Sequence, residues 1–312
     1  MSRLSLSTVI AIVAFSGMVR AGEIQWVPTY EKAMLDASAG NKIVLLVFMT
    51  DKSADCTKFK QETLADPAVQ AALSGIIPVL LTPDSPSAKE LAGRFAIETV
   101  PVTVFLDKEA GLLGKSAGFI TSADFIQEIK VARGGVEAYS ARLAAYKDTP
   151  SPATAVGLVE EYLIRQQAAK VAEIMQAARA IVEADKTITY NQRMSYSARL
   201  HIAEAFSQIK EAKTPDQVLN ILAKAEEEAA LADTESAARA GYLRGVLCLE
   251  AQRLEEGLKI LQNVVSAYPK AKWTPAAKEN LDAVKEELAR RAAEQAVANP
   301  PEGTPQPVPA AQ

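Results

Sequence analysis

Hydrophobic positions change their spacing near residue 133. Before that point, unbroken apolar runs at 43–49, 76–81 and 102–106 alternate with segments of helical spacing. Apolar runs of this length are typical of strands that are buried on both faces of a sheet. We expect a fourth strand over 112–119. Because strand and helix signals take turns, this part predicts a small α/β domain with helices on both faces of its sheet.

The helices of this first part are predicted from apolar spacing between the strands. They cover 29–38, 53–73, 87–96 and 122–132. Within 53–73, Asp66 precedes Pro67, which is the order of an N-cap and a first helical residue. The helix is therefore expected to kink or restart there, and Gly75 is expected to end it.

The second part, 134–297, has apolar residues every three or four positions and no strand-like run. This period predicts an all-helical domain of about six amphipathic helices. Prolines at 150–152, 215 and 269 mark breaks between helices. Residues 298–312 hold five prolines in fifteen positions, a composition that favours an extended, disordered tail.

The first 21 residues have the pattern of an export signal. Arg3 precedes an apolar run from Thr8 to Phe15, and residues 19–21 have the small-x-small form that signal peptidase accepts. We expect cleavage after Ala21. The apolar run is about half of the ~20 residues that a spanning helix needs. The sequence therefore predicts a signal peptide, no membrane span after cleavage, and a periplasmic or secreted protein.

Composition and charge argue against several function classes. The chain holds 34 basic and 38 acidic residues and has no basic stripe, so nucleic-acid binding is not expected. One histidine and two cysteines cannot supply the four ligands of a Cys/His zinc finger. The glycine patterns of phosphate-binding loops are absent as well. We therefore expect no metal site and no cofactor.

A stretch that begins in the first predicted strand resembles the active-site segment of thioredoxin-like proteins. Residues 48–59, FMTDKSADCTKF, match F-x-A-x-W-C-x-x-C-K of that superfamily, and Thr99-Val100-Pro101 resembles its proline loop. The landmarks occur in the superfamily's order. The resemblance implies a thioredoxin-like fold over 24–133 and a cis-proline at Pro101.

The redox motif itself is degenerate. The match places Ser53-Ala54-Asp55-Cys56 where the family has C-x-x-C. A dithiol enzyme attacks with one thiolate and resolves the mixed disulfide with a second thiol three residues on. A serine hydroxyl is far less acidic and forms no S–S bond. Val47 stands where the family has a buried acid. We therefore expect no dithiol catalysis; if the chain is an enzyme, it is a thiol–disulfide oxidoreductase.

Two features of the site, Cys56 and Val100-Pro101, keep open interpretations. Cys56 is either a small apolar residue in the first helical turn, a reactive thiol whose thiolate Lys52 or Lys58 and the helix N-terminus stabilise, or half of an intermolecular disulfide. Ser53 is expected to be the N-cap. In relatives, the backbone before the cis-proline pairs with a bound peptide. Val100-Pro101 is therefore either a peptide-binding edge or only a turn that closes the fold.

Residues 241–269 resemble a tetratricopeptide repeat. In that family, small residues let two antiparallel helices approach each other, and a proline ends the pair. Gly245 and Gly257 fall at the small positions, and Leu261 and Val264 at packing positions. The earlier helices keep no clear period of about 34 residues, so a plain helical bundle is the alternative. The resemblance implies a concave face for a protein or peptide partner.

Other polar and special residues are expected to be structural. His201, Glu160-Glu161 and Glu226–Glu228 are expected on solvated helix surfaces. Cys248 is expected in a helix core, and Gly111, Gly114, Gly134 and Gly135 are expected in turns.

The sequence thus predicts an α/β thioredoxin-like domain followed by an all-α tetratricopeptide-like domain. The expected function is protein binding or assembly in the cell envelope without dithiol redox activity. The alternative is a thiol–disulfide oxidoreductase or a monothiol redox protein that uses Cys56.

Overall fold

The computed structural model describes residues 24–209 and 212–298. It divides at Val136 into two compact units. The predicted export signal lies outside the described residues, and so does the predicted tail except for Ala298, which is the last residue of a helix. None of the helices in the described ranges combines the length and the apolar character that crossing a membrane requires.

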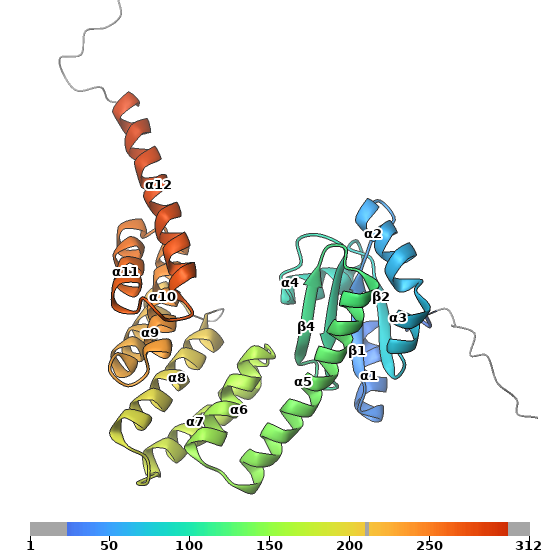
Figure 1. The fold of residues 1–312 in the computed structure, drawn as a ribbon, viewed down its shortest axis with the longest axis horizontal. Helices are drawn as coiled ribbons and strands as arrows, with labels where there is room; N and C mark the ends of the chain where they lie inside the picture. Colours follow the sequence, from blue (N-terminus) through green and yellow to red (C-terminus); the bar gives the residue numbers. More distant parts are fainter. Residues whose placement is uncertain (1–23, 210–211, 299–312) are drawn as a thin grey trace, which may run out of the picture. The chain divides into compact units, whose positions relative to one another are not determined.

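The first unit contains a four-stranded sheet with the strand order β2-β1-β3-β4 (Figure 1). Its strands are β1 Ile43–Phe48, β2 Ile76–Leu81, β3 Val102–Leu106 and β4 Leu112–Ala117. β1 runs parallel to β2 and antiparallel to β3, and β3 runs antiparallel to β4. The fourth strand ends at Ala117, because Gly118 adopts a φ of 82° and turns the chain away.

Helices cover both faces of this sheet, as predicted. They are α1 Tyr30–Gly40, α2 Ala54–Lys58, the π-helix η1 Phe59–Leu64, α3 Pro67–Ala72, α4 Pro86–Arg94 and α5 Ser122–Asp148. α1 and α4 pack on one face through Ala33, Ala37, Ala88 and Leu91. The other face is covered by α2, η1, α3 and α5. Both faces of β1 are therefore buried, which explains its unbroken apolar run.

The helix predicted over 53–73 is divided into three pieces. The π-helical turn follows α2 directly, and a new helix starts at Pro67. Asp66 caps that helix by accepting a hydrogen bond of 2.7 Å from the backbone N–H of Ala68. Buried Thr63 donates its hydroxyl to the carbonyl of Ile120 at 2.6 Å. The restart is thus where the Asp-Pro pair predicts it, whereas the π-helix has no signal in the apolar pattern.

Three glycines predicted in turns lie inside regular elements. Gly114 is in β4, and Gly134 and Gly135 are in the middle of α5, which continues without a break to Asp148. A Cβ on Gly135 would stand 3.3 Å from Cδ2 of Leu113. Gly135 therefore serves close packing rather than a turn, and helical structure does not begin anew at residue 134.

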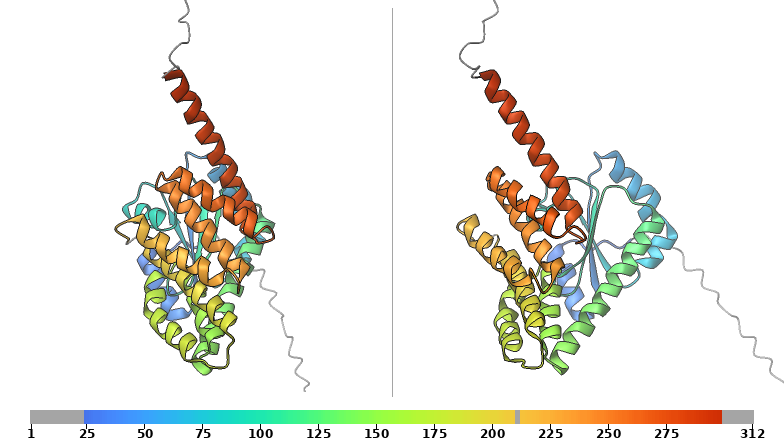
Figure 2. Two further views of the ribbon diagram at one scale, coloured as in Figure 1. Left: turned by 90° about the vertical axis from the view of Figure 1, so that its left-hand side faces the viewer. Right: turned by 60° about the vertical axis from the view of Figure 1, so that its left-hand side comes forward.

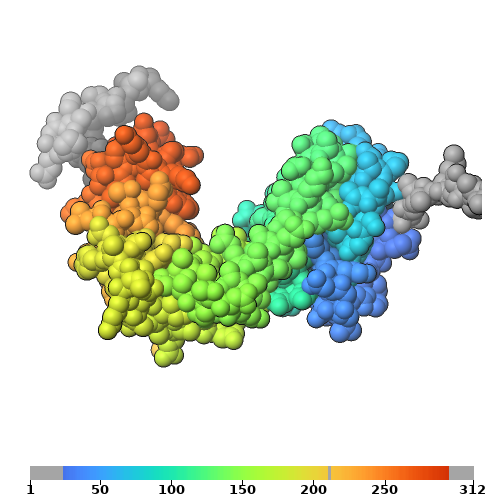
Figure 3. All heavy atoms as spheres, turned by 60° about the horizontal axis from the view of Figure 1, so that its bottom comes forward, coloured from blue at the N-terminus to red at the C-terminus, as the bar shows by residue number. Residues whose placement is uncertain are grey.

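The second unit contains seven helices after the end of α5 in its described part. They are α6 Pro152–Ile164, α7 Ala168–Ala184, α8 Tyr190–Gln208, α9 Pro215–Ala229, α10 Thr234–Glu250, α11 Leu254–Ala267 and α12 Thr274–Ala298. Each of them packs against its neighbour in the sequence, and their colours follow the chain order in Figures 2 and 3. Pro152 and Pro215 stand in the first helical turns, as the predicted breaks require.

Alternate helices begin at Pro152, Tyr190, Thr234 and Thr274, which are 38, 44 and 40 residues apart. Two of the connections have the same three-residue geometry. Gln166 between α6 and α7 has a φ of 56°, and Gln252 between α10 and α11 has a φ of 61°. These two helix pairs thus share a turn. The spacing between successive pairs along the chain is unequal, which explains why the sequence shows no constant period.

The helices α10 and α11 approach each other closely at two glycines. A Cβ on Gly245 would lie 2.6 Å from Cγ of Leu261, and one on Gly257 would lie 2.5 Å from Cδ2 of Leu249. Real Cβ atoms do not approach other atoms so closely, so the missing side chains allow this contact.

The acidic residues and the histidine predicted on solvated surfaces lie between helices instead. Glu160 binds Arg199, Glu161 binds Arg142, Glu226 binds Arg244 and Glu228 binds His201. Of the Glu226–Glu228 run, only Glu227 is exposed. The prediction was wrong because each helix packs against two neighbours, so that its polar face also meets another helix.

Candidate functional site

The degenerate motif lies where the chain leaves β1 and enters α2. Ser53 is the N-cap, and its Oγ accepts a hydrogen bond of 3.3 Å from the backbone N–H of Cys56. Its carbonyl accepts a second hydrogen bond of 3.1 Å from the hydroxyl of Thr57. Both oxygens of Ser53 therefore satisfy groups in the first turn of the helix. Ala54 and Asp55 are exposed beside it.

Cys56 has a free thiol and is only 3% exposed. It packs in the same core cluster as Val47 and Phe59. It also lines a cavity of about 360 Å³, together with Asp51 and Lys60 among others. The other cysteine of the chain is Cys248, so the first unit contains no second thiol that could resolve a mixed disulfide.

Neither predicted lysine is bonded to the thiol. Lys58 places its Nζ 4.1 Å from the centre of the Phe119 ring, in a cation–π contact. Lys52 is exposed, and within the described part of the chain neither lysine forms a hydrogen bond or ion pair with Cys56. The geometry therefore gives the thiol a helix N-terminus but no cationic partner.

The position of the family's buried acid is apolar. Val47 is fully buried in β1 and faces Thr103 directly across the β1–β3 pair. Thr103 is 3% exposed, and its Oγ1 has no hydrogen-bond partner among the residues described. Sequence reasoning missed Thr103, because its pairing with Val47 depends on the register of β1 and β3, which the alternation of side chains does not fix. A hydroxyl does not replace a carboxylate as a proton acceptor near neutral pH.

The peptide bond between Val100 and Pro101 is cis. The carbonyl of Pro101 accepts a hydrogen bond of 2.8 Å from the N–H of Gly118. The backbone N–H and C=O of Val100 have no such bond within residues 24–209 and 212–298. A cavity of about 410 Å³ lies beside Val100, lined in part by Ile97 and Lys89. An extended peptide could therefore pair with Val100 and place a side chain in this cavity.

Cys248 is fully buried in α10, and its thiol is free. Burial raises the pKa of the Cys248 thiol above its ordinary value. The position therefore suits a packing residue and not a nucleophile. In the part of the chain that the structure covers, no cluster of three or more histidine, cysteine, aspartate or glutamate residues could hold a metal ion.

The sequence model of a family described as "Thioredoxin-like domain" matches residues 30–133. No curated protein matches the chain. Among solved structures, a thioredoxin from Thermus thermophilus is 27% identical, with a TM-score of 0.33; the match covers 35% of this chain and 86% of that one.

Two further solved structures are similar to part of the chain. A DsbH oxidoreductase is 19% identical, with a TM-score of 0.31 and coverage of 42% of this chain and 94% of that one. The C-terminal domain of Neisseria meningitidis DsbD in the reduced form is 21% identical, with a TM-score of 0.29 and coverage of 32% and 90%. Residues 30–133 of this chain thus form a thioredoxin-like domain, and a helical region follows it.

Proposed function

We propose that this chain is an exported protein with a binding or assembly role in the cell envelope, and that its thioredoxin-like domain does not exchange disulfides. The observation that carries the proposal is the role of Ser53. Its Oγ caps a helix at the position where a dithiol enzyme has its attacking sulfur. The remaining thiol, on Cys56, is buried and has no second thiol in its unit.

The open backbone at Val100 supports a binding role for this domain. Its free N–H and C=O suit the addition of an extended segment to the sheet edge, and the neighbouring cavity suits one of its side chains. Substitution of Pro101 by alanine should weaken capture of an extended peptide at this edge. Unchanged capture would contradict a peptide-binding role for Val100-Pro101.

The helical unit supports the same role. The close approach of α10 and α11 at Gly245 and Gly257 fits a tetratricopeptide-like pair, and stacked pairs of this kind offer long surfaces to protein partners. The unequal spacing of the helix pairs indicates a divergent array.

Export is proposed from the first 21 residues, which have the composition of a cleaved signal. Export would bring the protein to the periplasm or outside the cell. N-terminal sequencing of the protein from its own host should find a chain that begins at Gly22. A chain that keeps residues 1–21 would contradict this localisation.

The central experiment is insulin reduction by the purified chain in the presence of dithiothreitol. We expect a rate equal to that of dithiothreitol alone, with a thioredoxin as the positive control. Turnover comparable to the thioredoxin would contradict the proposal, because a single buried thiol does not provide it.

A monothiol redox protein is the second candidate, since Cys56 lines a cavity that also contains Lys60. Alkylation by iodoacetamide at neutral pH separates the two candidates. A packing residue should react at least about tenfold more slowly in the folded chain than in the unfolded chain, because burial hinders access of the reagent. Rapid alkylation of folded Cys56 would favour the monothiol function.

A further inference from the structure

Arg239 in α10 forms no ion pair within the described residues. Its guanidinium carbon lies 5.6 Å from the ring centres of both Phe206 and Trp273. Within the described residues it forms no ion pair and no hydrogen bond, and its buried Nε has no partner. Removal from water lowers the pKa of Arg239. A charge that is held away from water without an anion is unfavourable unless something else supplies the anion.

Glu160, whose charge acts on Arg239, and Asp233 at the start of α10 have other partners. Glu160 holds Arg199 through two hydrogen bonds of 2.8 and 2.5 Å. Asp233 accepts hydrogen bonds of 2.7 Å from the hydroxyls of Ser195 and Ser236. The folded chain therefore gives Arg239 no ion pair of its own, although the charge of Glu160 acts on it from a distance.

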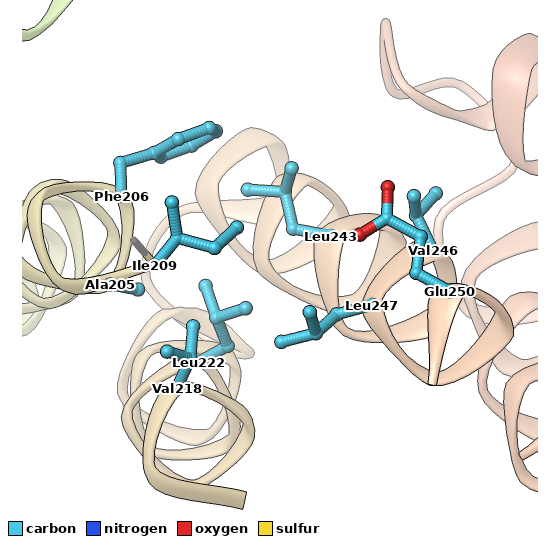
Figure 4. A pocket seen from close by; sticks show the side chains of 9 residues that line it. All are labelled: Ala205, Phe206, Ile209, Val218, Leu222, Leu243, Val246, Leu247 and Glu250. Atoms are coloured by element: carbon cyan, nitrogen blue, oxygen red, sulfur yellow. The ribbon is translucent and has the colours of Figure 1, made fainter. Parts of the chain in front are cut away.

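An apolar cavity of about 180 Å³ is lined by residues of α8, α9 and α10 and by Ile209 at the end of α8 (Figure 4). It is lined by Ala205, Phe206, Ile209, Val218, Leu222, Leu243, Val246, Leu247 and Glu250. Phe206 connects the two features, because its ring faces Arg239 and also lines the cavity. Leu243 lies one helical turn after Arg239 on α10. Ile209, at 45% exposure, leaves an apolar side chain open to solvent at the cavity.

The size of the cavity indicates its occupant. Sites for small molecules usually enclose about 300–1,000 Å³, whereas this volume suits one large apolar side chain. Glu250 at the cavity lies eleven residues after Arg239, which is about 16 Å along α10. The surface therefore offers a positive group, an apolar cavity and a negative group in that order along one helix.

We infer that Arg239 and this cavity bind a peptide segment of a protein partner that carries an aspartate or glutamate beside a large apolar side chain. The carboxylate pairs with Arg239 between the two aromatic rings, and the apolar side chain enters the cavity next to Phe206 and Leu243. This inference rests on the proposed binding role of the helical unit and adds to it the chemistry of the partner.

The test uses the full chain and two pools of N-acetylated, C-amidated octapeptides. One pool has Asp or Glu at position three and Leu, Phe or Trp at position six; the other has Asn or Gln at position three. We expect the chain to retain the acidic pool at least about tenfold better. Equal retention of the two pools, or retention of neither, would overturn the inference.

Variants identify the site. Arg239→Gln should lose the preference for acidic peptides, whereas Arg239→Lys, which keeps the charge, should retain part of it. Arg290→Gln is the matched control, because Arg290 is exposed and paired with Glu287 and Glu294, and it should bind like the unchanged chain. An unaltered acidic preference in Arg239→Gln would overturn the inference.

Two readouts separate binding from a structural role. Arg239→Gln should change the unfolding temperature little, because the loss of two cation–π contacts is offset by the removal of a partly buried charge that has no ion pair within the described chain. In a Trp26→Phe background, the fluorescence of Trp273 should change and saturate with a retained acidic peptide. A lowered unfolding temperature, or fluorescence that does not respond, would place Arg239 in a structural role instead.

The outcomes are distinguishable from those of the proposed function. Insulin reduction tests the thioredoxin-like domain, and its outcome does not depend on whether the helical unit prefers acidic peptides. If instead the chain self-associates and Arg239→Gln abolishes the association, a second copy fills the cavity, and the inference of a separate partner is overturned.

Discussion

The Oγ atom of Ser53 accepts a hydrogen bond of 3.3 Å from the backbone N–H of Cys56. The side chain that would attack a disulfide in a dithiol relative here satisfies the first turn of a helix. The two residues are three apart and stand in the order of a redox motif, so the motif keeps its position and lacks one sulfur.

The Ser53→Cys variant should therefore form a disulfide with Cys56 under mild oxidation, because the pair then has the spacing of C-x-x-C at a helix N-terminus. Mass spectrometry after oxidation and alkylation should show this segment with two thiols protected, and insulin reduction should rise above background. The Ser53→Ala variant is the control and should show neither effect. Two freely alkylated thiols in Ser53→Cys after oxidation would contradict the prediction.

Gly245→Ala should destabilise the helical unit, although alanine favours helices. The new Cβ would meet buried Leu261 at 2.6 Å, and overpacking typically costs about 1–3 kcal/mol. The gain in helix propensity is only about 1 kcal/mol. Gly134→Ala in α5 is the matched control, because nothing lies within 4 Å of its Cβ.

That control should stabilise the first unit by up to about 1 kcal/mol. Urea unfolding followed by circular dichroism measures both variants. Equal effects of the two substitutions would show that space at the glycine does not decide the sign.

Glu226→Ala should lower the free energy of unfolding by about 3 kcal/mol, because it leaves the charge of Arg244 without its buried partner. Glu227→Ala, one residue on, removes an exposed carboxylate and should change the stability by less than about 0.5 kcal/mol. Thermal and urea unfolding compare the two. Similar losses in both variants would contradict the placement of Glu226 between helices.

The helical unit should lose stability as the pH rises above about 8.5, the ordinary pKa of a cysteine thiol. Burial raises the pKa of Cys248, so the unfolded chain releases this proton at a lower pH than the folded chain does. The folded state then binds more protons, and the free energy of unfolding falls with pH. Burial also raises the pKa of Tyr268, which extends the fall above about pH 10.

Urea unfolding between pH 7 and 10.5 measures this dependence. Cys248→Ala should shift the onset of the fall from near pH 8.5 towards pH 10, because Tyr268 is then the group of the helical unit in that window whose pKa burial raises. A stability profile of the Cys248→Ala variant that parallels that of the unchanged chain would contradict the assignment to the thiol.

The strands of the first unit could be predicted because β1 is buried on both faces and its apolar run is unbroken. The Ser53–Cys56 segment could be placed from its resemblance to a redox motif. The apolar pattern does not predict the π-helix at Phe59–Leu64, since a change in hydrogen-bond spacing alters the helix without altering which residues are apolar.

The site in the helical unit could not be predicted from the sequence. Arg239 looks like any helix arginine until α8 and the segment before α12 place Phe206 and Trp273 against it. Glu226 was expected in solvent for the same reason, because the sequence does not show which helix packs against it. Its burial depends on a neighbouring helix that lies 18 residues further along the chain at Arg244.

The glycine contact between α10 and α11 bears on how tightly a ligand could be held. At Gly245 and Gly257 the backbone of each helix packs against a leucine side chain of the other, Leu261 and Leu249, so α10 has few alternative arrangements there. A segment that settles on α10 would find its surface already ordered and would lose little affinity to rearrangement of the receptor. An interface of small area could then be enough for a stable complex.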